Sequence, residues 1–134
     1  MFIRFFIICF YSILIASGCV HASDTVKDAS QCNIDLNHDG LLDTAVNISH
    51  GESYELVVLL KTVSAYDVHT LRISKSKMIL SCVNGDSVES TAAGEGKVNK
   101  FSTGGTYLRL TQPEGASIVY FLDGKDFKEV WTAD

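Results

Sequence analysis

Short apolar runs separated by turn-forming residues recur along this chain, and they limit its possible folds more than any other feature. The run Ser53–Lys61 reads SYELVVLLK, and its valines and near-continuous apolar character predict a central strand buried on both faces. Thr106–Thr111 alternates in period two, so its two leucines should face one way and Tyr107 and Arg109 the other. Downstream of residue 22 we find no convincing 3.6-residue periodicity, the period that indicates an amphipathic helix.

The C-terminal end carries the strongest hairpin signal. Ala116–Leu122 is a dense apolar run, and Phe127–Thr132 has a second strand pattern. Asp123-Gly124 lies between them, and Asp-Gly between two strand patterns predicts a tight hairpin. Trp131 would lie in the last strand. We interpret it and the nearby aromatic residues as core side chains in preference to a sugar-stacking platform.

The middle of the chain is less regular. Leu71–Ser74 and Met78–Val83 are shorter apolar runs, and Asn84-Gly85-Asp86 is a turn signal. Residues 86–104 are polar and small, which predicts a long, mobile loop with one weak strand near Val98–Phe101. Together these patterns predict an all-β fold, a single small antiparallel sandwich or curled sheet.

The N-terminal segment is typical of a secretory signal peptide. Residues 1–22 contain one charge, Arg4, then the apolar run Phe5–Ile15, then small residues. The run is shorter than the ~20 apolar residues that a membrane span needs. The remaining residues, 23–134, have the length of one domain.

Two cleavage sites are compatible with this segment. Val20-His21-Ala22 would place the mature start at Ser23, whereas Ala16-Ser17-Gly18-Cys19 resembles a bacterial lipobox and would make Cys19 a lipidated first residue. We therefore expect a periplasmic protein or an outer-membrane lipoprotein, with secretion as a further alternative. Contact with a membrane is expected only through a lipid anchor at Cys19.

The cysteine positions predict a disulfide, and the net charge limits the expected partners. Of the four cysteines, only Cys32 and Cys82 lie beyond the leader, and in an oxidising compartment they are expected to form one disulfide. The chain has 11 basic and 16 acidic residues, a formal net charge of −5, and loss of Arg4 with the leader would make it −6. An acidic domain lacks the electrostatic footprint for phosphate backbones, so nucleic acid is not an expected partner.

The segment Asp35–Asp43 reads DLNHDGLLD and has the spacing of a calcium loop. Calcium takes six to eight oxygen ligands, and alternate residues of a tight loop can point their side chains to one centre. Gly40 would permit the sharp turn. A solvated turn is the alternative interpretation. The expected ligands are the side chains of Asp35, Asn37, Asp39 and Asp43, with the Leu41 carbonyl completing the shell.

Two resemblances accompany this loop. The loop and its strand-like flanks, Gln31–Asp35 and Asp43–Ile48, resemble the calcium loops of FG-GAP (integrin-α) propeller repeats; one repeat is too few for a propeller. The sequence YFLDGKDFKEVW at Tyr120–Trp131 looks like the C-terminal aromatic hairpin of small bacterial periplasmic proteins or lipoproteins that also carry an FG-GAP-like loop. This resemblance implies export and architecture, and calcium in a structural role.

No catalytic motif stands out. The histidines beyond the leader, His38, His50 and His69, belong to no recognisable catalytic or zinc spacing, and Gly104-Gly105 is an isolated pair that suggests a loop hinge. We therefore expect a non-enzymatic envelope protein, a β-rich binding or interaction module whose partner could be a protein. A periplasmic inhibitor or immunity protein that blocks a partner enzyme is the second hypothesis, because an acidic surface can plug a basic cleft. An uncharacterised hydrolase is the third.

Overall fold

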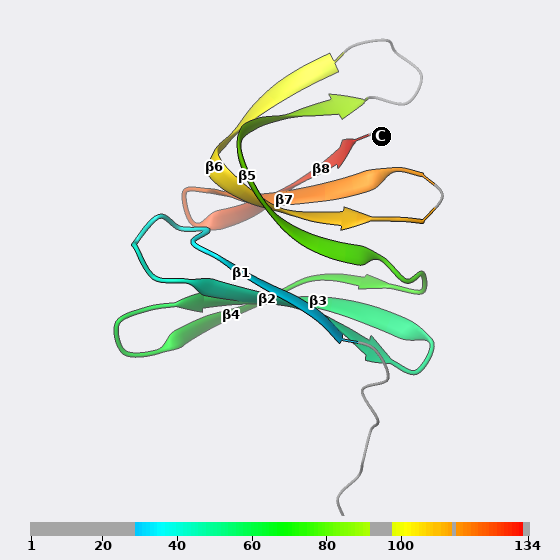
Figure 1. The fold of residues 1–134 in the computed structure, drawn as a ribbon, viewed down its shortest axis with the longest axis horizontal. Coiled ribbons are helices and arrows are strands. Elements are labelled where there is room, and N and C mark those ends of the chain that lie inside the picture. Colours follow the sequence, from blue (N-terminus) through cyan, green and yellow to red (C-terminus); the bar gives the residue numbers. More distant parts are fainter. Residues whose placement is uncertain (1–28, 92–97, 114, 133–134) are drawn as a thin grey trace, which may run out of the picture.

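The described part of the chain forms eight strands in two four-stranded antiparallel sheets (Figure 1). The computed structural model describes residues 29–91, 98–113 and 115–132, so the predicted signal peptide and its cleavage sites lie outside it. In each sheet the strand order follows the chain order. Sheet A contains β1 (Ala29–Ile34), β2 (Asp43–His50), β3 (Ser53–Lys61) and β4 (Tyr66–Ser74). Sheet B contains β5 (Ile79–Thr91), β6 (Val98–Thr111), β7 (Ser117–Asp123) and β8 (Asp126–Thr132).

This architecture confirms the predicted all-β sandwich. The C-terminal hairpin is also confirmed, since β7 and β8 pair from Ser117 with Thr132 to Asp123 with Asp126, and Gly124 has the positive φ of 68° that the turn needs. No helix in the described residues is long and apolar enough to cross a membrane.

The main core lies between the two sheets. Alternate residues of β2 and β3 are buried, as expected for strands that cover a core with one face only. Sheet B contributes the opposite wall, and Leu108 and Leu110 point into this core while Tyr107 belongs to a different cluster, as period two predicts. The buried members from sheet A include Ala45, Leu56, Val58 and Leu60, and those from sheet B include Leu80, Leu108, Leu110, Ile118 and Tyr120.

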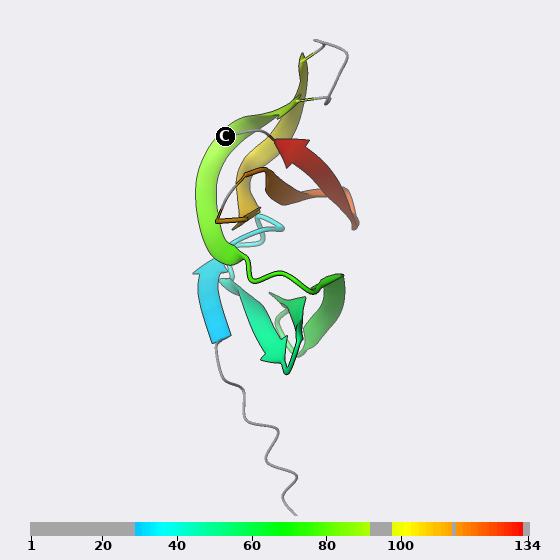
Figure 2. The ribbon, with the colours of Figure 1, turned by 90° about the vertical axis from the view of Figure 1, so that its right-hand side faces the viewer.

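Sheet B is strongly curled, and the curl creates a second, smaller core. The long hairpin of β5 and β6 bends back over the sheet, and Figure 2 shows β5 as a continuous arc. The register of β5 and β6 shifts between Gly85 and Ser87, and on β6 Gly104 and Gly105 have positive φ values of 73° and 116°. The Thr103 hydroxyl donates to the Gly85 carbonyl across the bend. The second core contains Val88, Tyr107, Val119, Phe121 and Val130.

The bend corrects two predictions. Asn84-Gly85-Asp86 is an irregularity inside one continuous strand rather than a turn, because Gly85 lets the strand change direction without ending it. Residues 86–91 and 98–104 belong to β5 and β6 rather than to a loop, and residues 92–97 lie outside the described part of the chain. The polar character of this segment reflects a hairpin with one face in water.

A disulfide joins the two sheets at one side of the sandwich. Cys32 of β1 and Cys82 of β5 are bonded, with their Cα atoms 5.8 Å apart, which confirms the predicted pair. Both strands are edge strands of their sheets. In Figure 2, β1 lies below β5 on one side of the molecule, and β4 lies below β8 on the other. The bond therefore closes one of two open sides.

Candidate functional sites

The loop between β1 and β2 gathers three of the predicted calcium ligands around shared amide donors. The Asp39 amide donates to Asp35 Oδ1 and to Asn37 Oδ1, both at 3.2 Å. The Gly40 amide donates to Asp35 Oδ2 at 2.9 Å, and the Leu41 amide donates to Asp39 Oδ1 at 2.8 Å. Asp39 and Asn37 are exposed. The side-chain oxygens of Asp35, Asn37 and Asp39 therefore lie close together.

Asp43, the fourth predicted side-chain ligand, has separate partners. It is completely buried, and its Oδ2 accepts from the Leu36 amide at 2.8 Å while its Oδ1 accepts from the Lys61 amide at 2.7 Å. Asp43 thus ties the start of the loop to the end of β3. Within the described ranges, no group of three or more His, Cys, Asp or Glu side chains is placed to hold a metal ion. The donor set of the loop is all oxygen, which is the chemistry that calcium requires.

The same loop packs against the bend of sheet B. The Thr106 hydroxyl donates to the Asp35 carbonyl at 2.8 Å. A Cβ added at Gly104 would lie 3.3 Å from His38 Nε2, and one at Gly105 would lie 3.6 Å from His38 Cε1. The glycine pair lies at the bend within β6 and not in the predicted loop, and its lack of side chains leaves space for the His38 ring.

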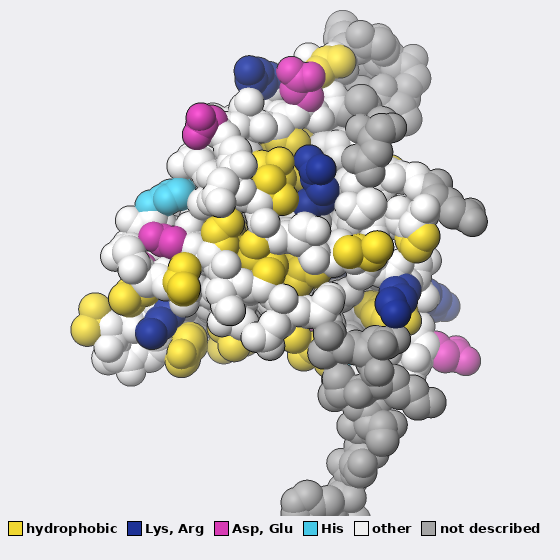
Figure 3. Space-filling view, viewed as in Figure 1, with side chains coloured by type: hydrophobic (Ala, Val, Ile, Leu, Met, Phe, Trp, Pro, Cys, Tyr) yellow, Lys and Arg dark blue, Asp and Glu magenta, His cyan; other side chains and the backbone are white. Residues whose placement is uncertain are grey.

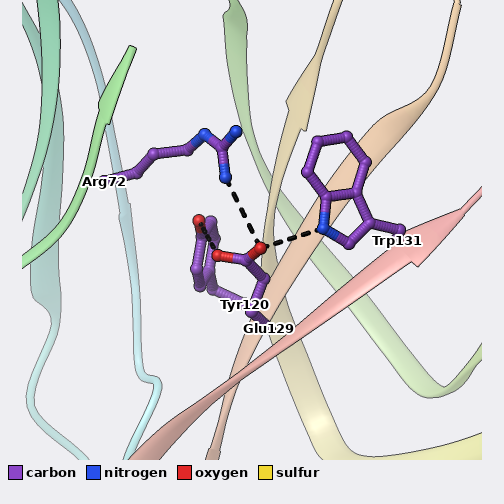
Figure 4. Close-up of polar contacts among 4 residues, drawn as sticks. All are labelled: Arg72, Tyr120, Glu129 and Trp131. Atoms are coloured by element: carbon purple, nitrogen blue, oxygen red, sulfur yellow. Dashed lines mark hydrogen bonds and ion pairs between the residues drawn. The ribbon is translucent and has the colours of Figure 1, made fainter.

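A polar cluster between β4 and β8 closes the second side of the sandwich (Figure 4). Glu129 accepts from the Tyr120 hydroxyl at 2.6 Å, from Trp131 Nε1 at 2.9 Å and from Arg72 Nη1 at 3.4 Å. The Arg72 guanidinium lies 5.1 Å from the centroid of the Trp131 ring. Burial, reinforced by the Glu129 carboxylate, raises the pKa of Tyr120 well above its ordinary value. We call these four residues the Glu129 cluster.

Sequence reasoning missed this cluster and partly misassigned its aromatic residues. Tyr120 and Phe121 are core residues, as predicted, but Trp131 is 43% exposed and covers the seam between the sheets. The correction has a simple cause: Trp131 pairs with Ile118 at the edge of sheet B, where Arg72 from the other sheet lies above its ring. Arg72 is 57 positions away from Glu129 in the chain, so local patterns carry no signal for the contact.

The outer face of sheet A carries exposed and partly exposed apolar side chains. Strand register places one set of residues on the face that points away from the core. We call it the docking face; its apolar residues are Val46, Ile48, Val57, Leu59, Tyr66, Val68 and Ile73, and Glu55, Lys61 and Thr70 lie on the same face. Val68 and Ile73 are 61% and 71% exposed. Figure 3 shows hydrophobic side chains gathered at the lower rim of the molecule, around the connection between β3 and β4.

This surface overturns the prediction for β3. Its bounds are as expected and it is a central strand, but only Leu56, Val58 and Leu60 are buried, and Val57 and Leu59 are partly exposed. The other dense apolar run became β7, which is buried on both faces because the β5–β6 hairpin covers it. No described segment covers β3 in the same way.

The three histidines do not form one site. His38 lies against the glycine pair. His50 Nε2 lies 3.4 Å from Glu55 Oε2, and His69 Nε2 lies 3.2 Å from Asp67 Oδ2. His69 lies on the edge strand β4, and its ring contacts Phe127 edge-on at 5.2 Å. Comparison of the chain with models of protein families, with curated proteins and with solved structures gave no significant match.

Proposed function

We propose that this chain is an exported, non-enzymatic binding module that contacts a protein partner through the docking face of sheet A. One observation carries the proposal: β3 has apolar residues on both faces, and no described segment covers the outward face. Exposed apolar side chains cost free energy in water, about 25 cal/mol for each Å² left uncovered. A contiguous apolar face is therefore typical of a surface that is buried in a complex.

The position of β4 supports the proposal that a partner binds the docking face. β4 is the outer strand of sheet A, so one of its edges pairs with no other described strand. Val68 stands opposite Leu59, which continues the apolar face to this edge, whereas Ile73 stands opposite Glu55. A partner on the docking face could therefore also reach the backbone groups of β4.

Capture from an envelope extract of the source organism tests this surface. The expected result is that residues 23–134 retain a specific protein, and that Val68→Lys with Ile73→Lys loses it. Ile79→Lys is the matched control, because Ile79 is also exposed, at 56%, but belongs to sheet B. Equal capture by both variants would refute the docking face. Cleavage of a captured molecule would point to the hydrolase hypothesis.

An inhibitor or immunity role is a second candidate, favoured by the acidic balance of the chain, 16 acidic against 11 basic residues. Asp39 is an exposed acidic side chain in the loop between β1 and β2. If an acidic loop plugs a basic cleft, Asp39→Lys should abolish capture and Val68→Lys should not. The opposite pattern favours the docking face.

The calcium loop is part of the proposal in a structural role. Asp35, Asn37 and Asp39 would hold the ion, and calcium would compete with the loop amides for the same lone pairs. Because a ligand of the folded state stabilises it by mass action, calcium at a hundredfold excess over its Kd should add about 2.7 kcal/mol. Melting curves with chelator and then with calcium measure this, and Asp39→Ala should remove the response. An unchanged midpoint at millimolar calcium would identify a plain turn.

A further inference from the structure

Sheet B opens a slot where β6 leaves β7. The two strands pair only from Leu108 to Thr111 on β6, whereas β6 pairs with β5 over its whole N-terminal half. Figure 1 shows this half of β6 rising away from β7 as the hairpin bends. A cavity of about 450 Å³ lies in the gap, within the range of about 300–1,000 Å³ that is usual for ligand sites. We call it the β6–β8 slot.

The floor and wall of the slot are apolar. Phe121 and Val130 are buried at 3% and 6% exposure and form the floor, while Phe101 of β6, 37% exposed, stands above them. Phe101 pairs with Val88, which is a member of the second core, so the Phe101 side chain lies on the core side of the hairpin. An apolar group that entered the slot would therefore contact two aromatic rings.

The wall of the slot also offers backbone groups. From Val98 to Ser102, one edge of β6 pairs with β5, and Lys100, Phe101 and Ser102 of this segment line the slot. In an antiparallel strand, every second residue directs its N–H and C=O to each edge, so this segment presents donors and acceptors that pair with no other described strand. Such an edge accepts an added strand by main-chain hydrogen bonds.

The charged side chains at the rim of the slot differ in whether they form ion pairs. Lys128 Nζ lies 3.7 Å from Asp123 Oδ2, and the Glu129 carboxylate is held by the Glu129 cluster, which includes Arg72. Lys100 forms no ion pair with any described residue, and the exposed Glu89 stands opposite it on β5. This local positive charge stands on a chain whose formal net charge is −5. The rim of the slot therefore favours an acidic ligand.

We propose that the β6–β8 slot binds an extended peptide that adds as a strand to Val98–Ser102 and alternates apolar with acidic residues. Neighbouring residues of β6 face opposite sides, so a paired strand has one set of side chains on the Phe101 side and the other on the Lys100 side. The apolar set packs on Phe101 and Phe121, and the acidic set meets Lys100. This site is in sheet B and is independent of the docking face of sheet A.

The test uses capped synthetic peptides and residues 23–134 with the disulfide intact. The probe has the sequence Glu-Val-Glu-Phe-Glu-Val, and affinity is measured by titration calorimetry. The expected result is saturable binding with slower hydrogen exchange at the amides of residues 98–102. Lys100→Glu should weaken binding about fivefold, whereas Lys125→Glu, an exposed lysine in the β7–β8 turn, should leave it unchanged.

Two control peptides complete the test. Replacement of each Glu of the probe by Lys should abolish binding, and N-methylation of alternate amides should abolish it in one register, because it blocks the hydrogen bonds to β6. Equal binding of either control, or binding without protection of residues 98–102, would overturn the proposal. Protection of these amides that rises with protein concentration, without peptide, would also overturn it, because a second copy of the chain would then fill the slot.

Discussion

Asp43 shows how one residue can belong to a recognisable motif and still have its main role in the fold. It is the last position of the calcium-type spacing, but it is completely buried and accepts from the backbone amides of Leu36 and Lys61. A buried carboxylate loses hydration free energy, and hydrogen bonds from N–H groups compensate for that loss. The spacing of the loop identified the residue, and only the three-dimensional structure identifies its partners.

Substitution of Asp43 should therefore destabilise the whole domain. Asp43→Ala leaves two amides without acceptors, each worth about 1.5–3 kcal/mol because the acceptor is charged, so we expect a loss of about 3 kcal/mol or more. Asp39→Ala is the matched control. Because its carboxylate is exposed, Asp39→Ala should lower the free energy of unfolding by less than about 1 kcal/mol when calcium is removed by a chelator. Urea unfolding curves measure both, and equal losses would contradict the assigned role of Asp43.

Tyr120 should make the stability fall at high pH. Its pKa is raised by burial and by the hydrogen bond to Glu129, so the folded state retains the phenolic proton longer than the unfolded chain, whose tyrosines titrate near pH ~10. The stability that Tyr120 contributes is complete below pH ~10. Above it, the free energy of unfolding should decrease by about 1.4 kcal/mol per pH unit until the raised pKa is reached.

Comparison with Tyr120→Phe isolates this contribution. Phenylalanine keeps the ring and has no proton to lose, so above pH ~10 its free energy of unfolding should fall less steeply than that of the wild type. Denaturant unfolding at several pH values measures the two slopes. Parallel slopes would mean that Tyr120 ionises in the folded state as easily as in the unfolded chain.

At the scale of the strands, the local sequence was enough to predict those features that neighbouring residues determine. The Asp-Gly turn gave the β7–β8 hairpin, and period two separated the leucines of β6 from Tyr107 and Arg109. Sequence was not enough where distant segments decide. Two similar apolar runs became β3 and β7, and only β7 is covered on both faces, because a hairpin that starts elsewhere bends over it.

The bend itself was hidden for a related reason. Asn84-Gly85-Asp86 and Gly104-Gly105 each look like an isolated turn or hinge, but they lie opposite each other in a paired hairpin. Together they form one bend, which the chain positions alone do not reveal. The disulfide was predictable, because only two cysteines lie beyond the predicted leader and an oxidising compartment favours a bond between them.

Gly104 should be needed for the bend. Its φ of 73° costs an L-residue about 1–2 kcal/mol, and an added methyl would lie 3.3 Å from His38 Nε2. Gly104→Ala should therefore lower the free energy of unfolding by at least about 1 kcal/mol. Gly115→Ala is the control, since nothing lies within 4 Å of its added Cβ. A thermal melt that ranks the two variants equally would show that the bend tolerates a side chain.

At the scale of the whole molecule, two links hold the sandwich together at opposite sides. The disulfide joins β1 to β5, and the Glu129 cluster joins β4 to the C-terminal hairpin. In the loop-entropy model the disulfide, whose cysteines are 50 positions apart, contributes roughly 4 kcal/mol. A small domain held in this way can leave an apolar face uncovered and stay folded, and our proposed function depends on that face.

Photo-crosslinking from the docking face is the most direct measurement of this central proposal. A benzophenone amino acid is placed at position 68 of the full chain, in cells of the source organism, and at position 125 as a control in the β7–β8 turn. The account predicts a discrete adduct of one protein from position 68 and none from position 125. Adducts that are absent from position 68, or identical from both positions, would contradict it.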